Sequence, residues 1–253
     1  MKKLSILIMF ITSVVGVSAQ AAASFTESIE KAHKKELFMS KKYLTYTIDI
    51  EFGGKQYMSG TITQEPGGGK IKIEKKDGSL IIFDGTNVYG TNITEKAHSG
   101  ARFDIFTWAY FFGLPYKLND EGTLWSNFED NNWGGENLKT GKLAFTSTTG
   151  DAPDDWYIVY VNKESNILKG AAYIVSFGKG KEKAEKEPHA IKYSKYKTIE
   201  EIPFASHWTF HMWNKKEGYK EQIGEVKLSN IKFTTNADFS VTKEGKLIKA
   251  PKS

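Results

Sequence analysis

The chain contains no cysteine and only one arginine, Arg102. Without cysteine it can form no disulfide, it has no thiol nucleophile, and it cannot be a lipoprotein anchored through an N-terminal cysteine. A single arginine also leaves few forked donors for phosphates and base edges, which nucleic-acid-binding proteins use widely. The net charge of +5 comes from lysines that are scattered among glutamates, as between Lys179 and Glu187. We therefore expect no nucleic-acid partner.

Long hydrophobic runs are also missing, except near the start of the chain. After Met1-Lys2-Lys3, residues 4–17 are mostly apolar, and small residues follow. A charged start, a short apolar middle and a small-residue exit are typical of a signal peptide. The run is shorter than the roughly 20 residues that a membrane-spanning helix needs, so a membrane anchor is the weaker alternative. We expect a signal peptide over residues 1–21, cleaved after Ala19 or Ala21, and a periplasmic or secreted protein that does not span the membrane.

No proline- or serine-rich linker and no repeat of fixed period divides the rest of the chain, which has only six prolines. A chain of this length can bury a sufficient core without disulfides, and β architectures of this size are often single domains. The sequence therefore predicts one domain over residues 22–240 and a loose polar tail over residues 241–253.

The spacing of apolar residues is helical at first and then changes to that of strands. Between Ser24 and Lys41 apolar residues recur three to four positions apart, which predicts an amphipathic helix. From Tyr43 to Phe52 apolar and polar residues alternate, as in a half-buried antiparallel strand. Gly53-Gly54 predicts a hairpin turn, and further glycine turns predict a meander of five strands that ends at Ile93.

Strand spacing returns in the second half of the chain, after a polar stretch over 119–141 in which we expect a short helix near Leu124–Glu129. The last strand changes phase near Ser229-Asn230, which predicts a β-bulge. The fold class expected is mainly β: a curved antiparallel sheet or incomplete β-barrel of about 10–11 strands, with an N-terminal helix and a central helical insert in the concavity. The second set of predicted strands covers Leu143–Ser147, Trp156–Val161, Ile167–Phe177, Ala190–Lys197, Ala205–Trp213 and Glu221–Phe233.

The sequence contains no motif that identifies a catalytic or metal site. His207 and His211 would share a helix face, but their segment alternates as a strand, where four residues span about 13 Å, too far for one zinc ion. The acidic group Asp151, Asp154 and Asp155 lacks the pattern of a known calcium loop, so an acidic turn is the preferred interpretation. We assign no catalytic residue, no metal and no cofactor.

One segment, from Phe103 to Phe112, is unusually rich in aromatic residues. Wound as a helix that ends at Gly113, it places Phe103, Phe106 and Tyr110 on one side and Ile105, Trp108 and Phe112 on another. A helix that is apolar all round must be covered on all sides. Two interpretations stay open: a core helix that fills the sheet, or a helix that also lines an apolar pocket.

Together with this pattern, the segments Phe112–Leu118 and Trp156–Glu164 resemble those of the outer-membrane lipoprotein carrier superfamily (LolA- and LolB-like), and of uncharacterised secreted Bacteroidetes proteins of that fold. The resemblance implies an incomplete barrel whose concave side holds apolar ligand, often acyl chains. The carriers hold their lid with a strand arginine that the first predicted strand lacks, so the resemblance implies a hydrophobic cavity rather than a lipoprotein-release cycle. The ligand-binding residues it suggests are Tyr46, Ile48, Ile50, Phe103, Phe106, Trp108, Tyr110, Phe112, Trp208, Phe210 and Met212.

The sequence thus favours an exported, non-enzymatic binder or carrier of lipid or another apolar molecule. A secreted hydrolase or glycan-active protein is the alternative, in which Trp125, Trp133 or Trp213 would be stacking platforms. A third possibility is a module that interacts with other envelope proteins.

Overall fold

The computed structural model describes residues 20–133 and 136–250. In this part of the chain, thirteen strands form one antiparallel sheet. They are β1 (Tyr43–Phe52), β2 (Lys55–Gln64), β3 (Ile71–Lys75), β4 (Leu80–Phe83), β5 (Val88–Thr91), β6 (Thr123–Trp133), β7 (Glu136–Phe145), β8 (Tyr157–Asn162), β9 (Leu168–Tyr173), β10 (His189–Ile199), β11 (Ile202–Asn214), β12 (Gly218–Thr234) and β13 (Lys246–Ile248).

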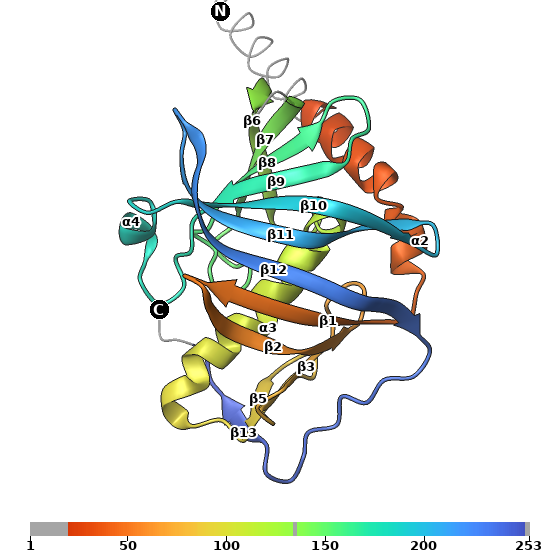
Figure 1. The fold of residues 1–253 in the computed structure, drawn as a ribbon, viewed down its shortest axis with the longest axis vertical. Coiled ribbons are helices and arrows are strands. Elements are labelled where there is room, and N and C mark those ends of the chain that lie inside the picture. Colours follow the sequence, from red (N-terminus) through yellow and green to blue (C-terminus); the bar gives the residue numbers. More distant parts are fainter. Residues whose placement is uncertain (1–19, 134–135, 251–253) are drawn as a thin grey trace, which may run out of the picture.

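The strands are ordered β13-β5-β4-β3-β2-β1-β12-β11-β10-β9-β8-β7-β6. The sheet is open, because its outer strands β13 and β6 do not pair with each other (Figure 1). The predicted mainly β class with an unclosed sheet is confirmed. The strand number is higher than predicted because the sequence analysis did not identify β6 and β13.

Strand β1 shows why the residues form this sheet. Its burial alternates along its length, with Leu44, Tyr46, Ile48 and Ile50 buried and the residues between them partly exposed. At the predicted hairpin turn, Gly53 and Gly54 both have positive φ, 55° and 71°. A turn of this kind suits the twist of the two strands it connects, and glycine adopts it without steric cost.

The central helix α3 (His98–Gly113) lies across the concave face of the sheet (Figure 1). Phe106 on α3 contacts Phe83 of β4, with ring centroids 5.1 Å apart, and Tyr110 on α3 contacts Tyr157 of β8 at 5.5 Å. Because β4 and β8 are far apart in the strand order, the sheet must curve around the helix to reach both. The helical insert in the concavity is therefore confirmed, and it begins five residues earlier than Phe103.

The N-terminal helical region is broken in two. Residues 20–32 are helical, Lys34 adopts a left-handed conformation with φ 59°, and α2 (Lys35–Met39) follows. The break rotates the second piece, so that Phe38 is fully buried while Leu37 is only partly buried. Residues 1–19, which carry most of the predicted signal peptide, lie outside the described part of the chain.

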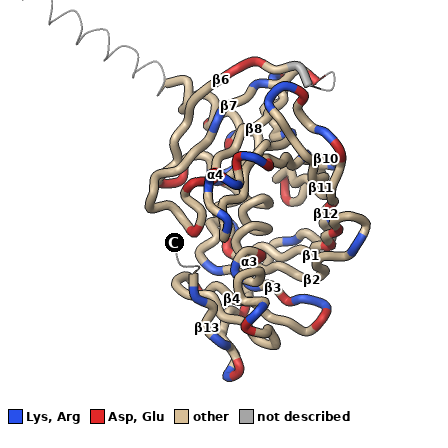
Figure 2. Tube along the Cα trace, turned by 90° about the vertical axis from the view of Figure 1, so that its left-hand side faces the viewer, with Lys and Arg blue, Asp and Glu red and all other residues tan. Residues whose placement is uncertain are grey.

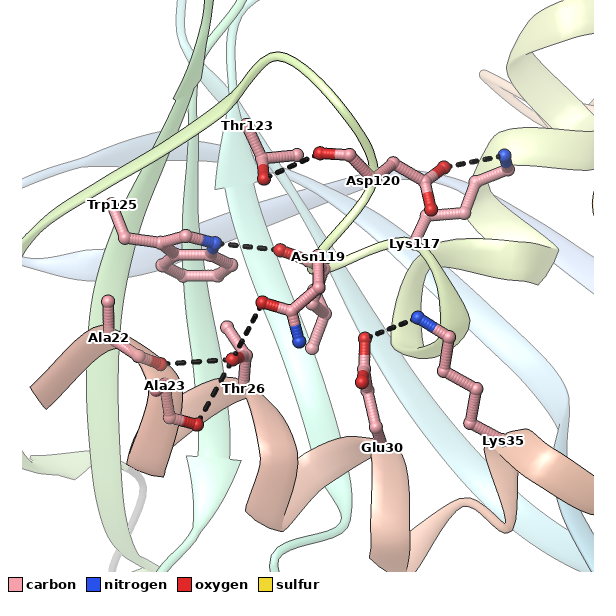
Figure 3. Close-up of polar contacts among 11 residues, drawn as sticks. Ala22, Ala23, Thr26, Glu30, Lys35, Lys117, Asn119, Asp120, Thr123 and Trp125 are labelled. Atoms are coloured by element: carbon pink, nitrogen blue, oxygen red, sulfur yellow. Dashed lines mark hydrogen bonds and ion pairs between the residues drawn. The ribbon is translucent and has the colours of Figure 1, made fainter. Parts of the chain in front are cut away.

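The first helical region is fastened to the loop that follows α3. The Thr26 hydroxyl lies 3.0 Å from the Asn119 side-chain oxygen and donates to the Ala22 carbonyl (Figure 3). The Leu118 carbonyl of the same loop accepts a hydrogen bond from the Trp125 indole N–H of β6 at 2.8 Å. Three short helices complete the described elements: η1 (Glu95–Ala97), η2 (Leu114–Tyr116) and α4 (Lys181–Ala184).

The prediction of a short helix near Leu124–Glu129 is wrong, because this segment belongs to β6. The pairing of β6 with β7 shifts register between Ser126 and Glu129, and Asn127 has φ 51°. Such a bulge turns side chains three positions apart to the same side. Trp125 and Phe128 both pack on Phe25 for this reason, at 5.3 and 5.4 Å, and their spacing resembles that of a helix.

The C-terminal segment also differs from the loose tail expected over 241–253. Residues Lys246–Ile248 form β13, which pairs with β5, and the Ile248 side chain is buried in the core. Two adjacent apolar residues in a polar stretch, of which only Ile248 is buried, carried too little pattern to predict this strand. The bulge expected in the last strand is confirmed: the pairing of β1 with β12 shifts between Thr45 and Thr47, opposite Asn230, whose φ is 52°.

Basic and acidic positions are interspersed along the strand ends and loops of the described chain (Figure 2). This arrangement agrees with the scattered lysines and glutamates of the sequence. None of the helices among the described residues is both long enough and apolar enough to cross a membrane.

Candidate functional site, a cavity beside the central helix

A cavity of about 370 Å³ lies beside α3 within the curved sheet. From α3 it is lined by Phe103, Phe106 and Tyr110, the side of the helix that the sequence grouped together. The opposite wall is also largely aromatic and comes from the second half of the sheet and the loop after it. Its members are Phe145, Tyr157, Tyr173, Val175 and Phe177.

The other side of α3 packs directly on the sheet. Phe112 stacks on Tyr46 of β1, with ring centroids 4.4 Å apart, and Trp108 contacts Phe210 of β11 at 6.1 Å. The helix therefore performs both roles considered from the sequence: one side fills the sheet and the other lines a cavity. The predicted residues that lie in this packed core, outside the cavity lining, are Tyr46, Ile48, Ile50, Trp108, Phe112, Trp208 and Phe210.

Met212 lies outside the cavity lining as well, and it is only partly buried. The pairing of β11 with β12 shifts register on both sides of His211, so the alternation of β11 ends after Phe210. Beyond this point Trp213 is buried in a second cluster, which includes Leu138 and Tyr160.

A buried carboxylate, Asp104, ties α3 to the first half of the sheet. Its side chain is 3% exposed, and it accepts hydrogen bonds from Lys75 (2.8 Å), the Tyr57 hydroxyl (2.8 Å) and the Trp108 indole (3.0 Å). Burial and the neighbouring carboxylate raise the pKa of Tyr57 well above its usual value, so this phenol remains a donor. These contacts fix the rotation of α3 and thereby which of its sides faces the cavity.

Two ion pairs border the cavity. Arg102 on α3 binds Asp151 through Nε (2.5 Å) and Nη2 (3.0 Å), and its Nη1 donates to the Ile248 carbonyl at 3.3 Å. Lys117 binds Asp120 at 3.0 Å in the loop before β6 (Figure 3), and it also donates to the Gly67 carbonyl. The only arginine is therefore engaged in joining α3 to a loop and to β13.

Asp155 is a partly buried carboxylate in the cavity lining, and it makes no ion pair with any of the described residues. It accepts a hydrogen bond from the Ser176 backbone N–H at 2.6 Å. Burial raises its pKa to about 6, although the Ser176 hydrogen bonds act in the opposite direction. Nearby, the Tyr110 hydroxyl oxygen is buried and has no hydrogen-bond partner in the described part of the protein.

We expect Asp155→Asn to stabilise the protein at about pH 7.5 by roughly 1–3 kcal/mol, because each pKa unit corresponds to about 1.4 kcal/mol. A carboxyl group whose folded pKa is raised from 3.8 to about 6 contributes stability below pH 3.8 that is lost as the pH rises through 6. The amide oxygen can still accept the Ser176 N–H. Denaturant unfolding at about pH 7.5 and about pH 4 measures the gain, which should vanish at the lower pH.

The exposed neighbour Asp154 provides the matched control, since it loses the same charge outside the cavity lining. Asp154→Asn should change the free energy of unfolding by no more than about 0.5 kcal/mol. Equal effects of the two variants at both pH values would contradict the assignment of an unfavourably buried charge to Asp155.

The other candidate groups of the sequence analysis lie outside the cavity lining. His207 and His211 are on strand β11, as predicted, where His207 contacts Glu225 and Ser194. Within the described residues, no group of three or more histidines and carboxylates is placed to hold a metal ion. Trp125 and Trp213 pack against other aromatic rings, and the Trp133 side chain is outside the described part of the chain.

The sequence analysis missed Phe145, Tyr157, Tyr173, Phe177 and Asp155 as cavity residues. They come from strands and loops that only the curvature of the sheet brings to α3. The alternation of β8 could have indicated that Tyr157 points inward, but no local signal identifies the partner across the cavity.

A half-open sheet wrapped around a central helix, with an aromatic cavity between them, defines a class of fold that other proteins share. The chain is similar to a domain named for outer membrane lipoprotein sorting from Vibrio parahaemolyticus, at 11% identity and a TM-score of 0.52 over 83% of this chain and 93% of that one. It is also similar to a LolA superfamily protein from Nitrosomonas europaea, at 10% identity and a TM-score of 0.56 over 85% of this chain and 97% of that one.

No protein-family model and no curated protein matches the sequence. The structural similarity at such low identity concerns the fold alone, and the chain has a LolA-like fold. The family resemblance inferred from the sequence is confirmed at this level.

Proposed function

We propose that the protein binds a single acyl chain or another small apolar molecule in the cavity beside α3, and that it carries this ligand in the periplasm or outside the cell. The observation on which the proposal rests is the cavity itself, about 370 Å³ with walls that are mainly aromatic and aliphatic. Ligand pockets usually measure about 300–1,000 Å³ and are lined mostly by apolar side chains with a few polar groups. This cavity is at the small end, which favours one chain over a whole diacyl lipid.

Core packing supports the same conclusion. Protein interiors are close-packed, and voids larger than a water molecule are few. The concave face of this sheet is filled by one side of α3, whereas Phe103, Phe106 and Tyr110 on its other side remain beside an unfilled space. The names of the two similar structures, which refer to lipoprotein sorting and to the LolA superfamily, are consistent with an apolar ligand.

Export is part of the proposal and rests on the sequence of residues 1–21. Mass spectrometry of the protein recovered from its own envelope would measure the N-terminus, expected after Ala19 or Ala21. An N-terminus at Met1 in that fraction would contradict the signal peptide. Native mass spectrometry of the same sample would reveal any lipid that remains bound.

A variant that fills the cavity provides a direct test. Thr107 lines the cavity from α3 and is partly exposed, so Thr107→Phe should occupy the space without removing a buried core side chain. We expect it to weaken binding of the apolar fluorophore N-phenylnaphthylamine by at least about tenfold, which corresponds to ~1.4 kcal/mol. Fluorescence titration of the delipidated protein measures this change.

Thr61→Phe is the matched control, because Thr61 is partly exposed on β2 opposite Thr47, on the outer face of the sheet. It adds the same ring far from α3 and should leave the affinity unchanged. If neither the wild-type protein nor the control bound the fluorophore, the proposed function would be wrong. If Thr107→Phe bound as tightly as wild type, the ligand would lie elsewhere.

A further inference from the structure

The cavity carries more negative than positive charge, although the whole chain has a net charge of +5. Its lining contains four carboxylates and two cations, a net charge of −2 when all are ionised. Both cations are engaged, Arg102 by Asp151 and Lys117 by Asp120. The two remaining carboxylates, the partly buried Asp155 and the exposed Glu121, make no ion pair within the described part of the chain, so the lining keeps an excess of negative charge beside an apolar space.

The aromatic rings of the lining contact one another around this charge. Tyr157 lies 5.5 Å from Tyr110, 6.0 Å from Phe145 and 6.0 Å from Tyr173, measured between ring centroids. The negative faces of aromatic rings attract organic cations, and cages of such rings bind quaternary ammonium groups. A ring of this lining already contacts a cation, because the Arg102 guanidinium lies 5.2 Å from the centre of Phe106.

We infer that the preferred ligand carries an ammonium group on its apolar body, and that Asp155 and the aromatic lining bind this group. This inference rests on the proposed function. The unpartnered Tyr110 hydroxyl is a further polar atom of the same lining. A ligand with a free carboxylate is disfavoured, because it would place a like charge beside Asp155 and Glu121 while the neighbouring cations are already paired.

Three probes of equal chain length separate charge from hydrophobicity: dodecyltrimethylammonium, dodecanol and dodecanoate. The two ionic probes are used below their micellar concentrations and dodecanol below its solubility limit. We expect dodecyltrimethylammonium to bind at least about tenfold more tightly than dodecanoate, with dodecanol between them. Calorimetric titration of the delipidated protein measures the three affinities. The overall positive charge of the protein would favour the carboxylate at the surface, so the expected order requires recognition in the cavity.

Asp155→Asn should remove most of the preference for the ammonium probe over dodecanoate. Glu164→Gln is the control, since it removes one carboxylate from the exposed turn between β8 and β9, outside the cavity lining. Equal affinities of the three probes, or tighter binding of dodecanoate, would overturn the inference and leave the proposed function standing. If dodecanol and the ammonium probe both failed to bind, the proposed function itself would fail.

A second pair of probes identifies the source of the ammonium group. Lysophosphatidylethanolamine and lysophosphatidylglycerol share chain and phosphate, and only the first carries an amine. Preference for the first would identify a lipid headgroup. If both lysophospholipids bound weakly while dodecyltrimethylammonium bound tightly, the ligand would be an amine without a phosphate group.

The effect of pH gives an independent readout, because the trimethylammonium group does not titrate. Asp155 lines the cavity together with Tyr110, Tyr157 and Tyr173, and the charges of Asp154 and Lys179 are near it. Burial raises the pKa of Asp155 to about 6, so its charge is lost as the pH falls from about 7.5 to about 5. Affinity for the ammonium probe should fall over this range in wild type and stay constant in Asp155→Asn; a pH-independent wild type would contradict the role of Asp155.

Discussion

Replacing Asp104 by alanine should destabilise the protein by about 3 kcal/mol, the lower end of the range for removing one partner of a buried ion pair. The carboxylate is almost fully buried and has three donors, one each from β2, β3 and α3. Without it, the buried Trp108 indole loses its acceptor, and Lys75 keeps its charge in a place that is only 19% exposed. Equilibrium denaturation with urea measures the loss.

Three further variants separate charge from hydrogen bonding. Asp104→Asn should cost less than alanine, because the amide oxygen can still accept from Tyr57 and Trp108. Lys75→Met should cost about 1–3 kcal/mol, since it leaves the carboxylate without its cation. On the same strand, Lys72→Met removes a pair with the half-exposed Glu74 and should cost less than about 1 kcal/mol. A loss below ~1 kcal/mol for Asp104→Ala would mean that this network does not hold α3.

The second large effect is a loss of stability in acid that depends on His33. This side chain is 1% exposed, and its Nε2 accepts a hydrogen bond from the backbone N–H of Leu168 at 3.0 Å. Nε2 therefore carries no proton in this arrangement. Burial lowers its pKa from 6.5 to about 3. Between these values the unfolded chain binds a proton that the folded protein does not, so stability falls as the pH decreases. We expect a loss of about 3 kcal/mol between pH 7 and pH 4 from this group.

The comparison with His33→Gln isolates this contribution, because the glutamine oxygen can still accept the Leu168 N–H. The variant should be less stable at neutral pH but should lose less stability on acidification. Asp155 acts in the opposite direction, and its contribution cancels when the two pH profiles are subtracted. His211→Gln, at a partly exposed histidine outside the cavity lining, serves as the control and should follow the wild-type profile. Parallel profiles of wild type and His33→Gln would show that His33 does not cause the acid sensitivity.

The elements with regular spacing were predictable from the sequence. β1 follows its alternation from Leu44 to Ile50, and α3 ends at Gly113 as expected. The failures have local physical causes: the bulge at Ser126–Glu129 imitates helical spacing, and β13 buries only Ile248. Pattern-based prediction assumes an uninterrupted period, and a bulge or a very short strand removes it.

Of the cavity lining, only the part that α3 contributes was predictable from the sequence. Phe103, Phe106 and Tyr110 share a side of α3 because of helical geometry, and that side faces the cavity. The sequence also suggested the inward rows of β1 and β11, whose members are buried in the core except Met212. Helix packing decides that α3 covers them, since Tyr46 stacks on Phe112. Which wall remains uncovered depends on sheet curvature, a property that no short stretch of sequence encodes.

The pairing of β1 with β12 has a consequence for how the chain assembles. Most neighbours in the sheet follow one another in sequence and can form as local hairpins, whereas this seam joins Tyr43 to Thr234. Contacts between such distant residues require closure of a large loop and slow folding. During synthesis, one edge of β1 therefore stays unpaired until Gly218–Thr234 has emerged from the ribosome. A chain truncated before Gly218 would keep this long unpaired strand edge and would be prone to aggregation.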